Sequence, residues 1–161
     1  MGIERSDDAK LIFAAITHYR RWIGLLIPTV IPDVDVSYQQ LNVLYFVRVE
    51  DASMADIARV LGVAPTVITG LVDRLEVRGL IRREPHPTDR RRIQLVLTER
   101  GIEISSMVEQ AVASRIEQQI STLDAGQQQR LRDGLVLFGQ LTSDLEDQLS
   151  SEIDDDGSQA S

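Results

Sequence analysis

The stretch Leu80–Leu97, LIRREPHPTDRRRIQLVL, decides how the chain folds, because it predicts two short strands joined by a turn. Apolar residues open the stretch and then alternate with polar residues at its end, a spacing typical of strands. Pro85, Pro87 and Asp89 lie between the two runs and favour a turn over a helix. Arg90–Arg92 follow directly. The stretch therefore predicts a β-hairpin with three guanidinium groups near its tip.

Two short helices joined by a tight turn are predicted just before this hairpin. Ser53, with Asp56 three residues later, begins a helix over Met54–Leu61. Gly62 ends that helix, and Pro65 occupies the first position of the next, which runs to Arg78 and ends at Gly79. A three-residue connection that contains glycine has the spacing of a helix-turn-helix. Together with the hairpin, this order predicts a winged helix-turn-helix domain over residues 35–100.

The second of these helices has two distinct faces. Its buried stripe is predicted to contain Ile68, Leu71, Val72 and Leu75. The first turns of the opposite face are where a recognition helix meets base edges, and we expect DNA contacts there from Thr66, Val67, Thr69 and Gly70. A plain solvated face is the alternative. Val67 is an apolar residue off the core stripe, which suits either a thymine methyl group or burial against a neighbouring helix.

The N-terminal part of the chain predicts two helices. Apolar residues at helical spacing indicate an amphipathic helix from Asp7 to about Leu26, ended by Pro28 and Pro32. Ser37, with Gln40 three residues later, forms a capping box for a second helix. The bulk of residues 1–34 is thus one long helix outside the winged domain.

The C-terminal part predicts two further long helices. Thr98 caps the first, from about Glu99 to Ser121, with its apolar side at Ile102, Ser106, Val108, Val112 and Ile116. Asp124 and Gln127 cap the second. The terminal helices, residues 1–34 and 101–150, are more apolar than a small winged domain can cover, so we expect them to form a two-fold homodimer. Residues 151–161 are polar and acidic, and we expect a disordered tail.

The composition narrows the classes of function. The chain has 161 residues, 43% hydrophobic and 26% charged, and no cysteine, which excludes disulfides, thiolate metal sites and thiol redox sensing. Its two histidines have no metal-ligand spacing, so we expect no catalytic residues, no metal and no cofactor. The N-terminus lacks the layout of a signal peptide, and the longest apolar run is interrupted by glycine and proline. We therefore expect a cytoplasmic protein that has no membrane partner and is not an enzyme.

The net charge of −8 is unevenly distributed. Residues 53–100 contain nine arginines against six acidic residues, a net charge of +3, whereas residues 101–161 carry −9. Arginine suits bidentate contacts to phosphates and bases. A basic region on an acidic chain is compatible with nucleic-acid binding.

Three strings of this sequence resemble the MarR family of bacterial transcriptional regulators. They are MADIARVLGV, ITGLVDRLEVRGLI and PTDRRRIQLVLTERG, within residues 54–101. The last is the most diagnostic, with Asp89, Arg91, Leu97, Thr98 and Gly101 at the family's positions. The resemblance implies that Arg91 enters the minor groove, that Asp89 braces the wing, and that Arg90, Arg92 and Arg74 contact the DNA backbone.

The sequence departs from the family pattern at two positions. Ala64 stands where a Ser or Thr often caps the recognition helix, and Gly70 where a long polar side chain often reads bases. Our hypothesis is that specificity depends mainly on the wing and on DNA shape.

The resemblance also implies a homodimer that binds a pseudo-palindromic operator as a repressor and responds to a small aromatic or phenolic effector. Candidate effector-pocket residues, for which packing is the alternative, are His18, Arg21, Trp22, Tyr38 and Tyr45. Two other functions stay open: a winged-helix protein-interaction module without DNA binding, and a transcriptional activator.

Overall fold

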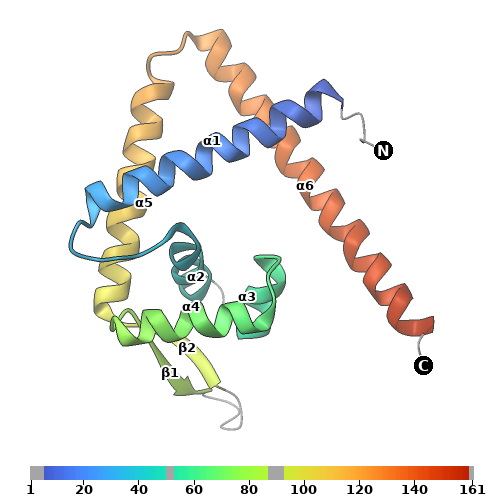
Figure 1. Ribbon diagram of the computed structural model, residues 1–161. Helices are drawn as coiled ribbons and strands as arrows, with labels where there is room; N and C mark the ends of the chain where they lie inside the picture. Colours follow the sequence, from blue (N-terminus) through green and yellow to red (C-terminus); the bar gives the residue numbers. More distant parts are fainter. Residues whose placement is uncertain (1–5, 50–52, 87–92, 160–161) are drawn as a thin grey trace. The chain divides into compact units, whose positions relative to one another are not determined.

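The structure is a computed structural model, and it describes residues 6–49, 53–86 and 93–159, with the side chains of those ranges except at 49, 150 and 152–159. The chain divides into two compact units, Met1–Ser114 and Arg115–Ser161. Helices dominate, and the two strands form one antiparallel hairpin, as expected for a winged helix-turn-helix. The elements in chain order (Figure 1) are α1 Asp7–Val30, α2 Tyr38–Val49, α3 Met54–Val60, α4 Pro65–Val77, β1 Ile81–Pro85, β2 Ile93–Leu97, α5 Glu99–Ile120 and α6 Ala125–Gln159.

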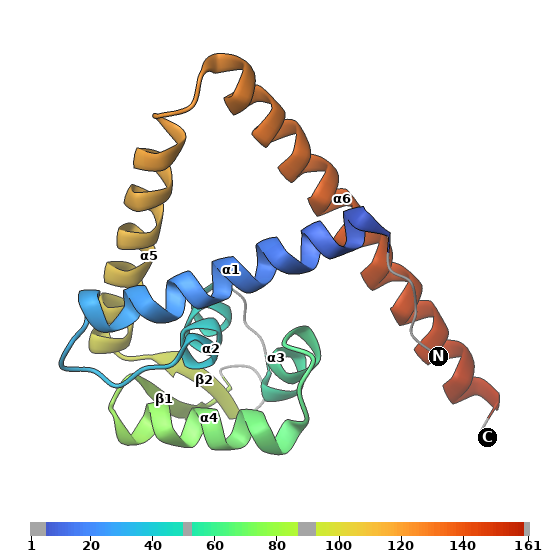
Figure 2. The same ribbon diagram turned by 45° about the horizontal axis from the view of Figure 1, so that its top comes forward.

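Helix α2 is the centre of the first unit. It lies between α1 on one side and α4 with the hairpin on the other (Figures 1 and 2). Its Val43 and Leu44 are fully buried and join one hydrophobic core with residues of every other element in the unit. The core includes the whole predicted stripe of α4, namely Ile68, Leu71, Val72 and Leu75. Burial of this one core therefore fixes α4 and the hairpin relative to α2.

Helix α1 is longer than we predicted, because it continues past Pro28 to Val30. Proline removes one backbone donor and crowds the carbonyl four residues earlier, yet Pro28 lies inside α1 and does not end it. The helix then ends with the Ile31 amide donating to the Ile27 carbonyl at 3.0 Å. Only the C-terminal part of α1 is buried in the core, through Ile23, Leu26 and Ile27.

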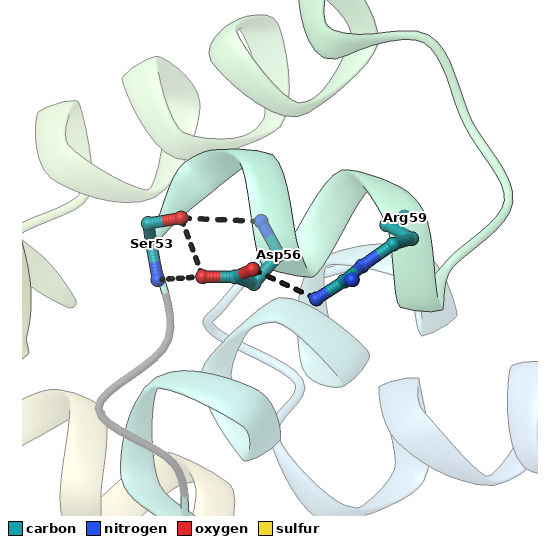
Figure 3. A network of polar contacts seen from close by, with 3 residues as sticks. All are labelled: Ser53, Asp56 and Arg59. Atoms are coloured by element: carbon teal, nitrogen blue, oxygen red, sulfur yellow. Dashed lines mark hydrogen bonds and ion pairs between the residues drawn. The ribbon is translucent and has the colours of Figure 1, made fainter. Parts of the chain in front are cut away.

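The predicted caps are present at the starts of α2 and α3. The Gln40 amide donates to Ser37 Oγ at 3.3 Å, while the Gln40 side chain accepts from the Ser37 amide at 3.0 Å. Ser53 and Asp56 form the same reciprocal pair, and Asp56 also binds Arg59 at 2.9 Å (Figure 3). Each capping box satisfies donors that a helix start leaves unpaired, which fixes where these helices begin.

The hairpin pairs five residues of each strand. Ile81 lies opposite Leu97, Arg83 opposite Leu95, and Pro85 opposite Ile93. Pro85 is therefore the last residue of β1, and not part of the turn as we predicted; a proline at the end of an edge strand costs no ladder bond. Burial falls along this face from Ile81 at 1% exposed to Ile93 at 55%. The base of the hairpin is core, and its outer end projects from the core.

The first turn of α5 packs on the chain just before β1. Thr98 caps the helix as predicted, accepting from the Gly101 amide at 3.0 Å, and its hydroxyl donates to the Gly79 carbonyl at 2.6 Å. The buried face of α5 contains Gly101, Ile104, Ser105 and Val108. Ile102, which we placed on the apolar side, is 48% exposed. The close approach of Gly101 to the backbone of Leu80 sets the rotation of α5 and turns Ile104 inward instead.

The second unit is mostly one helix. Asp124 and Gln127 cap α6 as predicted, with hydrogen bonds of 3.0 and 2.8 Å. The helix continues to Gln159, so the segment from residue 151 is helical and the expected disordered tail is wrong for residues 151–159. Once a helix has begun, each added residue costs little, and no proline interrupts this one. Large apolar side chains along α6 are exposed, at Leu131, Leu135, Val136, Leu137, Leu141, Leu145 and Leu149.

Candidate nucleic-acid interface

Helices α3 and α4 form the predicted helix-turn-helix. The direction of the chain changes by 114° between them, within the range of helix-turn-helix pairs. Gly62 has a φ of +62° in the connection, a conformation that side-chain-bearing residues rarely adopt. Gly79, with a φ of +67°, ends α4 and leads into β1. The two glycines thus allow the sharp changes of direction that present α4 beside the hairpin.

The predicted DNA-facing side of α4 is open. Thr66, Val67, Thr69 and Arg74 are exposed, and a Cβ atom added at Gly70 would meet no atom within 4 Å. Val67 is 42% exposed, so no helix among the described residues buries it. The Thr69 hydroxyl donates to the Pro65 carbonyl at 3.1 Å, which leaves its oxygen lone pairs as acceptors. The face offers DNA small side chains and little direct hydrogen-bonding capacity.

The N-terminus of α4 has alanine where a capping serine or threonine is usual. Ala64 is its N-cap residue and supplies no side-chain hydrogen bond, while Pro65 occupies the first helical position. Proline there has no amide hydrogen to leave unpaired, so it reduces the number of unsatisfied donors. The helix begins without the usual side-chain cap.

The predicted wing-tip residues lie outside the described part of the chain. These are Asp89, Arg90, Arg91 and Arg92. The structure describes the wing up to His86 and again from Ile93. The strands β1 and β2, on either side of this segment, extend outward from the core beside α4 (Figure 1).

Sequence reasoning missed an ion-pair cluster between β1 and α4. Arg83 Nη2 lies 2.6 Å from Asp73 Oδ1, and Arg83 Nη1 is hydrogen-bonded to Glu76 Oε2. The hydrogen bond to Asp73 and the nearby negative charges raise the pKa of Arg83, against the opposing effect of partial burial. Strand alternation was the available signal, because it places Arg83 on the same inward face as Ile81.

Arg74 of α4 and Arg78, the C-cap residue that follows the helix, differ in their surroundings. Arg78 binds Asp35 at 2.9 Å and also donates to the Arg74 carbonyl at 3.3 Å. Arg74 itself forms no ion pair with any residue that the structure describes, and it is exposed. Its guanidinium is therefore available to a phosphate.

A cavity of about 190 Å³ lies between α1, α2 and α5. Tyr38 and Tyr45, two of the predicted effector residues, line it together with Tyr19. Burial and the neighbouring Tyr38 raise the pKa of Tyr19 above its ordinary value. Arg48 also lines the cavity, where it pairs with Glu109 and donates to Ser106 at 3.4 Å.

The other predicted effector residues lie elsewhere. His18 and Arg21 are exposed and line neither this cavity nor the adjoining one. Trp22 packs against the core, with its ring centroid 6.0 Å from that of Tyr19. The adjoining cavity, of about 260 Å³, shares Tyr38 and is bordered by Arg20, whose guanidinium lies 5.9 Å from the centre of the Tyr38 ring. Tyr19, Arg20 and Arg48 are among the pocket residues that the sequence did not reveal.

The described residues contain neither a metal-binding cluster nor a single membrane-spanning helix. No group of three or more His, Cys, Asp or Glu side chains within 6–49, 53–86 and 93–159 is arranged to hold a metal ion. In the same ranges no single helix has the length and apolar character to cross a membrane, and α3 and α4 have them only when counted together as a bent pair.

Comparison with known proteins agrees with this architecture. A sequence model of the MarR family matches residues 34–92. An HTH-type transcriptional regulator from Bacillus subtilis, YfiV, is 27% identical over 106 residues, which are 65% of this chain and 66% of that relative, just under two thirds of its length.

Solved structures show the same fold. MarR from E. coli in its apo form is similar with a TM-score of 0.68 at 24% identity, over 84% of this chain and 98% of that one. FabT from Streptococcus pneumoniae, solved in complex with DNA, is similar with a TM-score of 0.72 at 19% identity, over 86% of this chain and 99% of that one. The family model therefore covers most of the winged helix-turn-helix of this chain, and the solved structures share its fold.

Proposed function

We propose that this protein is a transcriptional regulator that binds double-stranded DNA in a sequence-specific manner. The observation that carries the proposal is the uncovered face of α4 beside a projecting β-hairpin, with Arg74 unpaired among the described residues. A recognition helix uses such a face in the major groove. FabT, which has the same fold, was solved with DNA, and YfiV is described as a transcriptional regulator. Such a protein would work in the cytoplasm.

The charge distribution supports the same proposal. Net charge is +3 over residues 53–100, in a chain whose total is −8. The acidic remainder would repel the duplex, so electrostatic attraction favours the orientation in which α4 and the wing face DNA. Three of the nine arginines in this region, Arg90, Arg91 and Arg92, would meet the minor groove, where a narrow groove concentrates negative potential.

We propose further that the protein acts as a homodimer on a pseudo-palindromic site. Helix α6 presents an apolar stripe, here called the α6 stripe, made up of Leu131, Leu135, Phe138, Thr142, Leu145 and Leu149. Its alternating spacing of four and three residues is that of a helix that packs against a parallel or antiparallel partner helix. Helix α1 also exposes large apolar side chains, with Leu11 at 68% and Phe13 at 55%. In this proposal residues 1–34 and 101–150 dimerise, and residues 35–100 bind DNA.

The cavity lined by the three tyrosines is our proposed effector site. Its volume of about 190 Å³ is below the usual range for drug-sized ligands, so a single-ring aromatic compound fits best. A ligand there would contact α1, α2 and α5 together, and would favour the arrangement of these helices that it fits. If that arrangement differs from the one that binds the operator, the ligand releases DNA, which is the behaviour of a ligand-responsive repressor.

Selection of duplexes from a random-sequence library by the purified full-length chain tests the proposed function. The expected result is enrichment of a pseudo-palindrome whose half-sites lie about one helical turn apart. A panel of hydroxybenzoates then tests the effector, with release of the selected duplex as the expected result. Failure to enrich any duplex at low salt would contradict DNA binding and favour a protein-interaction module.

A further inference from the structure

The ion-pair cluster of Arg83, Asp73 and Glu76 lies where the hydrophobic contact between the hairpin and α4 ends. Inward-facing Ile81 and Leu95 are buried, at 1% and 9% exposed. Arg83 faces the same way and lies opposite Leu95, whereas the next inward-facing residue of β2, Ile93, is 55% exposed. Among the described residues, the cluster is thus the outermost attachment of the wing to the recognition helix.

The geometry of the cluster restrains the wing in a way that a single ion pair would not. Asp73 and Glu76 are three residues apart, so they extend from successive turns of α4 on one side of the helix. One guanidinium contacts both, through Nη2 at 2.6 Å to Asp73 and through Nη1 to Glu76. Because the guanidinium is planar and its donors are fixed, holding two carboxylates at once restricts the tilt of β1 along α4.

The charge of the cluster argues against a direct role in gripping DNA. One guanidinium and two carboxylates leave a net charge of −1, and both donor groups of the Arg83 fork are occupied by protein. A phosphate approaching this point would meet uncompensated negative charge. The cluster therefore does not attract the DNA phosphates. Any effect that it has on DNA binding must come from the way it positions the wing.

We propose that Arg83 is a positioning residue that sets the angle between the wing and the recognition helix. This inference rests on the proposed DNA-binding function, because that angle determines whether α4 and the wing tip can reach adjacent grooves together. The grooves of a duplex have a fixed geometry. If the wing moves freely relative to α4, binding must first order the wing, and the affinity for DNA falls.

The test compares two ways of breaking the cluster that change the charge in opposite directions. R83M removes one positive charge, and the double substitution D73N/E76Q removes two negative charges. Electrostatics alone predicts that D73N/E76Q binds DNA more tightly. The positioning role predicts that both variants bind the selected duplex about tenfold more weakly, and that R83K recovers part of the loss.

The dependence of affinity on salt separates positioning from contact. A residue that binds phosphate lowers the slope of log affinity against log salt by about one when it is removed. Because Arg83 is held by protein carboxylates, the slope for R83M should equal that of the wild type. Tighter binding by D73N/E76Q, or a slope lowered by about one in R83M, would overturn the proposal.

The distance between α4 and the wing can be measured in the protein without DNA, so the positioning role can be tested separately from DNA binding. The chain has no cysteine, so two introduced cysteines can carry spin labels at specific sites. Val77 on α4 and Ile93 on β2 are 89% and 55% exposed and accept labels without disturbing the core. The distance distribution for V77C/I93C should broaden with R83M and stay unchanged with R82M, since Arg82 faces outward and pairs with Glu84.

The outcomes distinguish this inference from the proposed function. Broadening with weaker duplex binding supports both. An unchanged distribution in R83M overturns the positioning role, whatever the affinity. If the wild type binds no duplex, the proposed function fails, and broadening would still show that the cluster holds the wing. Thermal unfolding of each variant checks the fold, and loss of this partly exposed cluster should change the melting temperature little.

Discussion

Gly101 lies where the first turn of α5 meets the backbone of Leu80. A Cβ atom built there would overlap the Leu80 carbonyl oxygen and would lie 3.0 Å from its carbonyl carbon. The Leu80 carbonyl cannot move away without cost, because it accepts a hydrogen bond from the Thr98 amide at 3.1 Å. Gly101 is thus required by a close approach of two backbones, although its own conformation is an ordinary helical one.

Gly101→Ala should destabilise the fold by about 2–4 kcal/mol, because either α5 or β1 must shift to relieve the overlap. Gly70→Ala is the matched control, since nothing lies within 4 Å of its added Cβ. Alanine in that helix interior should stabilise by up to about 1 kcal/mol. Chemical denaturation of the two variants measures both effects. Equal changes in the free energy of unfolding would show that the contact at Leu80 does not constrain the fold.

At the scale of elements, the wing and the recognition helix α4 should contribute differently to the proposed recognition of DNA. Helix α4 presents Thr66, Val67 and Thr69 around Gly70, a face with few hydrogen-bonding groups, and the Thr69 hydroxyl already donates to Pro65. Arginine in the minor groove responds to groove width and electrostatic potential. Sequence selectivity should therefore depend more on the wing than on α4.

Arg91→Ala should reduce the preference for the selected duplex over a scrambled one by about tenfold or more if this arginine enters the minor groove as we propose, because a guanidinium there responds to groove shape. Thr66→Ala should reduce the preference less, because its hydroxyl makes at most one base contact. Competition binding with both duplexes at one salt concentration measures the two ratios. Intact selectivity in Arg91→Ala, together with its loss in Thr66→Ala, would show that α4 reads the sequence directly.

Local patterns in the sequence predicted most of these elements. The capping pairs at Ser37, Ser53 and Asp124, the glycine turns, and the buried stripe of α4 each depend on residues within a few positions of one another, and all are present. Two features were missed because contacts between residues farther apart in the sequence determine them. The rotation of α5 follows from Gly101 against Leu80, and Arg83 pairs with acids seven and ten residues away.

The candidate site was less predictable than the fold. The spacing of apolar residues predicted correctly which face of α4 is exposed, because a buried stripe defines the opposite side of a helix. The pocket residues depend on how three helices pack, and the sequence suggested His18 and Arg21 where the structure has Tyr19, Arg20 and Arg48. Adjacent residues on a helix point about 100° apart, so an error of one position can move a side chain from the cavity to the solvent.

At the scale of the whole molecule, dimerisation should control DNA affinity. Leu145→Glu places a charge in the α6 stripe and should convert a dimer to a monomer, because burying an unpaired carboxylate is costly. Gln140→Glu, an exposed site off the stripe, adds the same charge as a control. Sedimentation velocity measures the state of each variant. A wild-type chain that is monomeric at micromolar concentration would refute the dimer.

The most direct test of DNA binding is the affinity of the wild-type chain for the selected duplex as salt is raised. Several arginines that displace counterions from phosphates give a linear fall of log affinity with log salt. We predict at least about a hundredfold loss between about 50 and 200 mM salt, which corresponds to four or more phosphate contacts. Affinity that does not change with salt, or no duplex binding at the lowest salt, would contradict the claim that α4 and the basic wing bind a DNA duplex.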